Sequence, residues 1–226
     1  MTEVIQFLQA IFLGLMMLLP LSNPLTAVVL FLSLSGKMSR AERDQQARLA
    51  AFYVFGIMTI GFYAGQFVMA SFGISMPGLR IAGGLIVSVI GFGMLFPKQP
   101  LEENLDLEGK AKELAQKSSN NIAFVPIAMP GTAGPGALAV IISSAATISS
   151  NPLNYPIWIY YVAPLVCFLA ISALLWVSLR SANSIMQWLG KSGIDAISRI
   201  MGFLLICMGV QFVITGVTDI VHSFLL

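Results

Sequence analysis

The sequence predicts an all-α polytopic membrane protein with six transmembrane helices as an inverted 3+3 repeat, in which spans 1 and 4 are broken into half-helices. Three observations lead to this prediction. Of the 226 residues, 57% are hydrophobic and 10% are charged, whereas a soluble domain carries about 25% charged residues. The apolar residues form six stretches long enough to cross a bilayer. A proline motif in the first stretch returns in the fourth.

The six apolar stretches lie, in chain order, at 4–35, 47–70, 78–96, 122–148, 157–179 and 196–221. A transmembrane helix needs about 20 predominantly apolar residues. The first and fourth stretches are longer than the others because each contains a proline break. The chain therefore divides into a first three-helix repeat over 1–96, a charged cytoplasmic linker over 97–121 and a second three-helix repeat over 122–226.

The first stretch contains the segment P-L-S-N-P-L-T-A at residues 20–27. A proline inside a helix removes one backbone hydrogen bond and clashes with the preceding turn. In lipid, such a break persists only where it is buried in protein or lines a polar cavity. Asn23 followed by Pro24 predicts a helix N-cap with proline at the first helical position. The alternative is a simple proline kink packed by neighbouring helices.

Lysine and arginine are distributed unevenly between the two predicted membrane faces. Eleven of the twelve lie in the segments that join spans 1 and 2, 3 and 4, and 5 and 6, and only Arg80 lies on the other face. By the positive-inside rule, the eleven face the cytoplasm and both termini face the periplasm. Most of the charge is expected in two loops, at 36–48 and 97–121.

The fourth stretch repeats the spacing of the first, as P-I-A-M-P-G-T-A at residues 126–133. Thr132 or Gly134, with Pro135 behind it, offers the start of a second half-helix. The third and sixth stretches also begin alike, with R-I-A-G-G-L at 80–85 and R-I-M-G-F-L at 199–204. Because each half then has three spans, an odd number, the halves must insert with opposite orientations.

The residue types that catalysis or metal binding would need are scarce in the spans. Cys167 and Cys207 lie in apolar stretches without a ligand pattern, and the single histidine, His222, is close to the C-terminus. The carboxylates lie in loops or at span ends. We therefore expect no enzyme activity, no cofactor, no metal and no nucleic-acid partner. The expected partners are the lipid bilayer and a small-molecule solute.

The chemistry left at mid-membrane is that of the two helix breaks. The N-terminus of a half-helix carries about half a positive charge and free N–H groups, which suit a carboxylate. Unwound carbonyls can receive an ammonium group, so the pair of breaks suits a small zwitterion. For the glycines, close helix packing is the alternative. The candidate substrate-binding residues are Ser22, Asn23, Pro24, Thr26, Pro130, Gly131, Thr132, Gly134 and Gly136.

A small-xxx-small pattern in the second span bears on oligomeric state. Gly61 and Gly65 are four residues apart on one helix face, a spacing that allows close approach of another helix. That helix could belong to the same chain or to a second copy, so a homo-oligomer is possible.

Four segments of the chain closely resemble the MarC family of bacterial inner-membrane proteins. They are N-P-L-T-A at 23–27, P-G-L-R-I-A-G-G at 77–84, N-I-A-F-V-P-I-A-M-P-G-T-A-G-P-G at 121–136 and I-S-R-I-M-G-F-L-L at 197–205. The resemblance covers essentially the full chain. It implies a six-span protein of the bacterial inner membrane, distantly related to LysE-type exporters. Some relatives are regarded as transporters or exporters of small neutral amino acids.

These observations favour a secondary transporter or exporter of small neutral solutes, with amino acids as the class, that works by alternating access. Export rather than uptake follows from the resemblance alone. A drug or antibiotic exporter is the second hypothesis, and it would need a wider, aromatic-lined cavity. A non-transporting membrane scaffold or regulator is the third. It leaves the repeated helix breaks unexplained.

Overall fold

The computed structural model describes residues 2–36, 38–97, 121–150 and 156–225. Every secondary-structure element in these residues is helical, which confirms the predicted all-α class. The elements are α1 (Thr2–Ser22), α2 (Pro24–Leu34), α3 (Arg40–Ser71), α4 (Met76–Leu95), η1 (Ala123–Thr132), α6 (Pro135–Ser150), α7 (Ile157–Arg180) and α8 (Ala182–Leu225).

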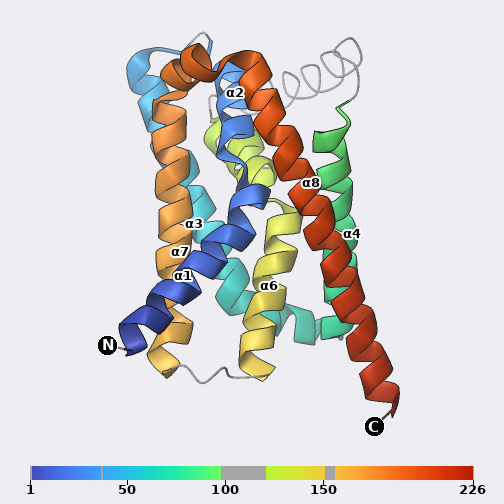
Figure 1. Cartoon of the computed structure of the whole chain (residues 1–226). Coiled ribbons are helices and arrows are strands. Elements are labelled where there is room, and N and C mark those ends of the chain that lie inside the picture. Colours follow the sequence, from blue (N-terminus) through green and yellow to red (C-terminus); the bar gives the residue numbers. More distant parts are fainter. Residues whose placement is uncertain (1, 37, 98–120, 151–155, 226) are drawn as a thin grey trace.

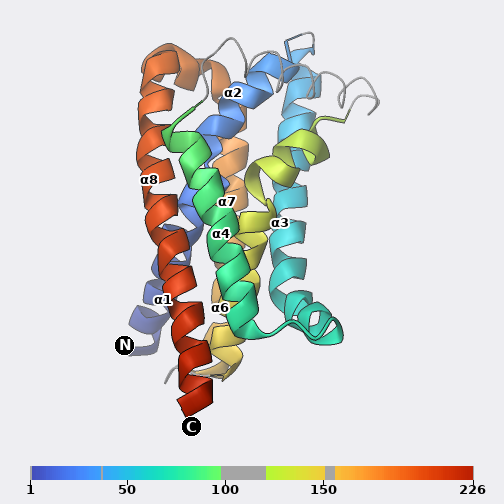
Figure 2. The same ribbon diagram turned by 90° about the vertical axis from the view of Figure 1, so that its right-hand side faces the viewer.

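The helices form a bundle in which both chain ends lie at the same end (Figure 1). Most helices run roughly along the bundle, whereas α1 crosses it obliquely and α2 continues it after a change of direction. In both views α4 and α8 lie side by side (Figure 2). Most of the predicted linker, residues 98–120, lies outside the described residues.

Five helical stretches in the described part of the chain are long and apolar enough to cross a membrane. They correspond to the predicted spans 1, 2, 3, 5 and 6, with α1 and α2 together forming the first. The predicted fourth span is divided between η1 and α6, and the apolar part of α6 is too short to count by itself.

The expected loop at 36–48 is wrong for most of its length, because α3 begins at Arg40. Ser39 and Glu42 form a capping box that starts the helix early. The Ser39 hydroxyl accepts a hydrogen bond from the Glu42 amide at 3.3 Å, and the Glu42 carboxylate accepts one from the Ser39 amide at 2.7 Å. The segment after Arg180 is helical as well. There α8 begins at Ala182 and changes direction at Gly190, whose φ of 65° interrupts the helix.

The apolar core lies between α3, α7 and the segments around α2 and η1. Its fully buried side chains include Phe31 of α2, Met58 of α3 and Leu175 of α7. A second face of α3 packs on α6 through glycines. A Cβ atom placed on Gly61 would lie 2.7 Å from Leu138, and one on Gly65 would lie 2.5 Å from Ile142. The small-xxx-small pattern therefore packs within the monomer.

Helices α4 and α8 are held together by paired glycines. A Cβ atom on Gly84 would lie 2.5 Å from the carbonyl oxygen of Gly209, and one on Gly91 would lie 2.6 Å from that of Gly202. Small residues allow helix backbones to approach closely in lipid, where van der Waals packing drives helix association. Helices α4 and α8 run in opposite directions (Figure 2). A glycine of α4 therefore faces a glycine of α8 at two positions along the helix pair.

Candidate functional site

The first predicted break is present and centres on Asn23. Helix α1 continues through Pro20 to Ser22, and α2 starts at Pro24. Asn23 has a φ of 27°, and its side-chain oxygen accepts a hydrogen bond from the Thr26 amide at 3.3 Å. The predicted N-cap with proline at the first helical position is therefore confirmed. Because Pro24 has no N–H group, the Pro20 carbonyl lacks the donor that a continuous α-helix would supply.

Two polar atoms at this break have no hydrogen-bond partner among the described residues. They are the hydroxyl oxygen of Ser22 and the side-chain amide nitrogen (Nδ2) of Asn23. Ser22 is fully buried and Asn23 is 7% exposed. Leaving a buried polar group without a partner costs about 1–3 kcal/mol. The break is thus a place where a bound solute or water would gain hydrogen bonds that the protein itself does not make.

The second break lies between η1 and α6. Hydrogen bonds from residue i to residue i−5 replace α-helical ones, as from the Ala133 amide to the Ala128 carbonyl at 2.9 Å. Helix α6 then starts at Pro135, and the Gly134 carbonyl accepts from the Leu138 amide at 3.0 Å. Gly134 therefore precedes the helix, whereas the Thr132 hydroxyl points back and donates to the Ile127 carbonyl at 3.1 Å. Of the two expected starts, the structure has the one at Gly134.

The two breaks lie side by side in the interior of the bundle (Figures 1 and 2). A Cβ atom placed on Gly136, just after the second break, would lie 3.5 Å from the Leu21 side chain, just before the first. Thr132, Gly134 and Gly136 are buried, as are Ser22 and Asn23. These five of the nine candidate residues are therefore buried within or next to the two breaks.

The other four candidate residues have different surroundings. Pro24 is buried at the start of α2. The Thr26 hydroxyl lies 3.3 Å from the hydroxyl of Ser198 on α8. Gly131 is exposed, and a Cβ atom there would lie 2.7 Å from the Pro126 carbonyl oxygen. The side chain of Pro130 lies outside the described part of the structure.

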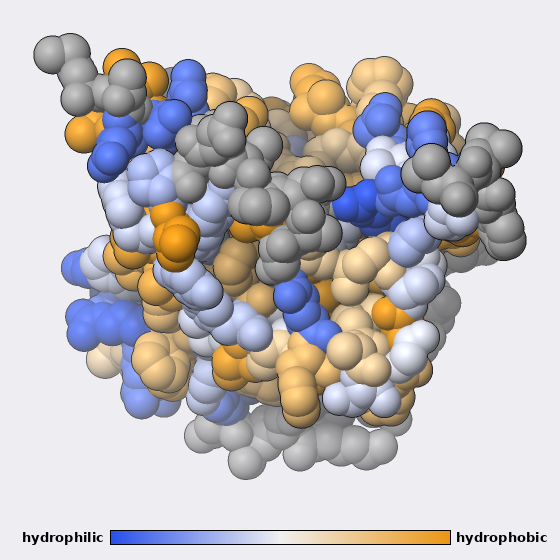
Figure 3. Space-filling model, turned by 90° about the horizontal axis from the view of Figure 1, so that it is seen from below, coloured by the Kyte–Doolittle hydropathy of each residue, from blue (hydrophilic) through white to orange (hydrophobic). Residues whose placement is uncertain are grey.

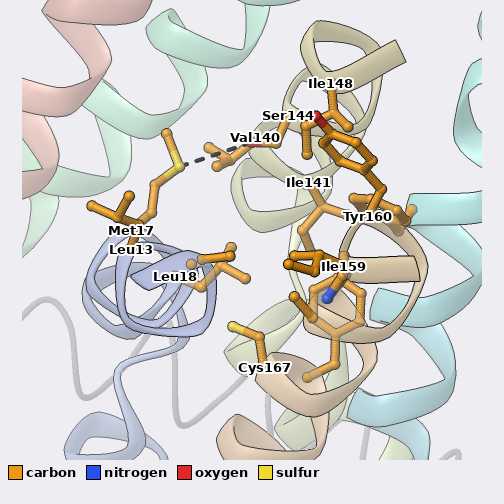
Figure 4. Close-up of a pocket in the computed structure, with 16 residues that line it drawn as sticks. Leu13, Met17, Leu18, Val140, Ile141, Ser144, Ile148, Ile159, Tyr160 and Cys167 are labelled. Carbon is orange, nitrogen blue, oxygen red and sulfur yellow. Dashed lines mark hydrogen bonds between the residues drawn. The ribbon is translucent and has the colours of Figure 1, made fainter. Parts of the chain in front are cut away.

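None of the nine candidate residues lines any of three cavities in the described part of the bundle. The most apolar of these three, of about 240 Å³, lies between α1, α6 and α7 and is shown in Figure 4. Met17, Leu18, Val140 and Ser144 point into it. The Ser144 hydroxyl donates to the Met17 sulfur at 3.8 Å. A second cavity, of about 380 Å³, shares Met17 and Ser144 with the first and extends to α4 and α8.

The third cavity, of about 610 Å³, lies at the other end of the bundle. Its lining is polar and charged, with Arg40, Asp44 and Arg180 among its residues. Along the first span, Leu18 lines the first cavity and Phe31 lines the third. The break at Asn23 lies between these two residues. Along the first span, the break therefore lies between a residue of a cavity at one end of the bundle and a residue of the cavity at the other end.

The sequence did not predict that the polar residues of the second cavity lie together. Arg80 of α4 pairs with Asp219 of α8, and its Nε lies 3.4 Å from the hydroxyl of Ser143 on α6. Gln211 and Thr215 of α8 complete the polar lining. Viewed from the end where the chain termini lie, hydrophilic residues are visible near the middle of the surface as well as at its rim (Figure 3). The solitary position of Arg80 outside the charged loops was the available signal.

Comparison with known proteins gives a consistent result. The family described as "MarC family integral membrane protein" matches residues 8–221. The chain is 58% identical to the UPF0056 inner membrane protein MarC of Citrobacter koseri and 57% identical to that of Salmonella typhimurium, in each case over 96% of this chain and 97% of the relative. The protein of the same name from Escherichia coli is 56% identical over the same shares. No solved structure matches significantly.

The matched residues include both helix breaks, the glycine contacts of α4 and α8, and Arg80 with Asp219. The apolar helices and the names of the relatives agree on a multi-pass protein of the inner membrane. The chain belongs to the MarC family of integral membrane proteins.

Proposed function

We propose that this protein is a secondary transporter of small neutral solutes, with amino acids as the class, rather than an enzyme. One observation carries the proposal. The break between α1 and α2 holds two buried polar atoms, on Ser22 and Asn23, without a partner among the described residues. Along the first span, the same break lies between Leu18, which lines a cavity at one end of the bundle, and Phe31, which lines a cavity at the other end. In an alternating-access cycle, a solute that binds these atoms would enter from the cavity at one end of the bundle and leave through the cavity at the other end.

The charge pattern of the breaks suits a zwitterion. The N-termini of α2 and α6 each present a partial positive charge to the site, which favours a carboxylate. The Pro20 carbonyl, deprived of its regular donor, is available to an ammonium group. Ser22 and Asn23 add a hydroxyl and an amide at the same level. No full charge is needed on the protein for a solute with no net charge.

The side chains at the two helix breaks support a small solute over a drug. A drug exporter would be expected to place aromatic side chains at its site, whereas the breaks contain short polar side chains and glycines.

The proposal includes an inverted repeat of two three-span halves, 1–96 and 122–226, joined by the 97–121 linker. The paired glycines support it, because α4 and α8 occupy equivalent places in the two halves. Gly84 and Gly91 are seven residues apart, as are Gly202 and Gly209, and each helix meets the other through both of its glycines. An approximate two-fold axis in the membrane plane, passing between α4 and α8, would generate this arrangement.

The expected membrane orientation places both termini in the periplasm, because eleven of the twelve lysines and arginines lie in segments on the opposite face. Alkaline phosphatase fused to either terminus should be active in cells, and green fluorescent protein fused to the C-terminus should be dark. A fluorescent C-terminal fusion would contradict both the orientation and the inverted repeat.

Transport itself can be tested with the purified protein in proteoliposomes. Flux of radiolabelled glycine, alanine, serine and threonine should exceed that of protein-free liposomes for at least one of them. Repeating the measurement with and without proton and sodium gradients would identify the coupling ion. If no flux is found under any gradient while a labelled antibiotic is moved, the drug-exporter hypothesis replaces the present one.

A further inference from the structure

The second cavity carries one charged residue, and that residue is mostly buried. It lies near the end of the bundle that carries the chain termini, since Arg80 is in the second turn of α4. The Arg80 side chain is 15% exposed. A guanidinium group held inside a cavity of about 380 Å³ is positioned to bind an anionic group of a small molecule. The lining residues are Met17, Arg80, Ser143, Ser144, Ile148, Met208, Gln211, Phe212 and Thr215.

The contacts of Arg80 indicate which anionic group fits. Its terminal nitrogen pairs with the carboxylate of Asp219, and its Nε lies 3.4 Å from the Ser143 hydroxyl. The guanidinium therefore already holds a carboxylate next to a hydroxyl. Asp219 is more exposed than Arg80, at 37%, and lies near the C-terminal end of α8. Its carboxylate can turn toward water when another carboxylate takes its place, whereas Arg80 stays within the cavity.

The neighbouring apolar cavity provides room for the rest of such a molecule. Met17, Ser144 and Ile148 line both cavities, so the two adjoin. Beyond Met17, the first cavity is lined mainly by aliphatic side chains, such as Leu13 and Ile159 (Figure 4). A molecule with its carboxylate near Arg80 can therefore place an aliphatic group past Met17, where apolar surface is removed from water.

We propose that Arg80 and Ser143 form a carboxylate-binding subsite for a small solute in which a carboxylate adjoins an aliphatic group, and that the solute displaces the carboxylate of Asp219. The inference rests on the proposed transport function, because it supplies the site where a transported amino acid is first held on the side of the chain termini. Binding at this subsite can still be measured without any transport.

The test measures equilibrium binding to the purified protein in detergent. The probes are L-leucine, 4-methylpentanoate, which keeps the carboxylate but lacks the ammonium group, and L-leucinamide, which lacks the carboxylate. Both carboxylates should bind and leucinamide should not compete with them. Arg80→Gln should weaken both carboxylates by at least about tenfold, because a charge-assisted hydrogen bond is lost. Asp219→Asn should tighten 4-methylpentanoate by at least about threefold, because the internal competitor is removed.

The two substitutions should change the affinity for 4-methylpentanoate in opposite directions. If the ion pair of Arg80 and Asp219 were purely structural, both substitutions would disturb the fold and weaken binding alike. Arg199→Gln is the matched control, since it removes the same charge from an exposed position on α8 and should leave binding unchanged. In Arg80→Gln the carboxylate of Asp219 loses its partner, which could impair folding. The double variant Arg80→Gln/Asp219→Asn removes that carboxylate as well, and its affinity for both carboxylate probes should be as low as expected for Arg80→Gln. Asp219→Asn decides the question even by itself.

Four results would each overturn the subsite. Arg80→Gln could bind the carboxylates as well as Arg199→Gln does, or leucinamide could compete as strongly as leucine. Asp219→Asn could bind 4-methylpentanoate more weakly than the wild type, or neither carboxylate could bind the wild-type protein at millimolar concentration. Binding that responds as expected, without flux in proteoliposomes, would instead reject the transport function and leave the subsite standing.

Discussion

Gly91→Val is expected to destabilise the protein strongly, because the added side chain separates α4 from α8. A Cβ atom at Gly91 would lie 2.6 Å from the Gly202 carbonyl oxygen and 2.9 Å from the Ile206 amide nitrogen. Both are backbone atoms, so no side-chain rotation can relieve the contact. Overpacking of this kind costs about 1–3 kcal/mol and occasionally more. The measurement is the midpoint of thermal unfolding in detergent, followed by fluorescence-detected size exclusion.

Gly93→Val is the matched control for this prediction. Gly93 lies on the same helix, two residues away, and a Cβ atom there meets nothing within 4 Å. Both variants make the same change of residue type in one helix, so their difference reports the contact with α8. Gly93→Val should unfold close to the wild-type temperature. Equal losses in the two variants would mean that the glycine pairing does not hold α4 against α8.

Asn23→Gly is expected to abolish most transport while leaving the amount of folded protein nearly unchanged. Glycine accepts the positive φ of this position and costs only a few tenths of a kcal/mol at a helix N-cap. The substitution removes the buried side-chain amide whose nitrogen has no partner among the described residues. Flux per folded protein should therefore fall far more than the unfolding temperature.

Asn23→Ala distinguishes the role of the Asn23 side chain in stability from its role in transport. Alanine also removes the amide, loses a cap worth about 1 kcal/mol and is strained at a φ of 27°. It should therefore match Asn23→Gly in transport and fall below it in stability. Wild-type flux by both variants would show that the amide of Asn23 does not contact the solute.

The first helix break was predictable because its causes are local. Pro24 removes a backbone donor, and the Asn23 side chain caps the helix that follows, so eight consecutive residues contain the necessary chemistry. The second break was predictable in place but not in detail. Its sequence offers two starts for α6, and the hydrogen bond of the Thr132 hydroxyl to Ile127 depends on the π-helical path of η1.

The ion pair of Arg80 and Asp219 could not be predicted from the sequence. Arg80 and Asp219 are 139 residues apart, and only the packing of α4 against α8 brings them together. Counting charges sets Arg80 apart from the other basic residues in the sequence, but it predicts only a membrane orientation and not the partner of Arg80. The pairing of the glycines of α4 and α8 likewise depends on the relative register of the two helices, which the sequence does not give.

The start of α3 is a different kind of error, because the signal was present in the sequence. Ser39 and Glu42 have the spacing of a capping box, and the structure contains both of its hydrogen bonds. The charged composition of residues 36–48 hid this signal, since an exposed helical turn and a solvated loop have similar charge. Composition alone therefore did not locate the start of the helix.

The central claim is that the protein carries small neutral amino acids across the membrane, and solute counterflow tests it most directly because no coupling ion need be known. Proteoliposomes loaded with unlabelled glycine, alanine, serine or threonine are diluted into a trace of the same labelled amino acid. A carrier predicts transient accumulation of label above its equilibrium level for at least one of the four, and loss of that accumulation with Asn23→Gly. Label that only equilibrates, at the rate of protein-free liposomes for all four, would contradict the claim.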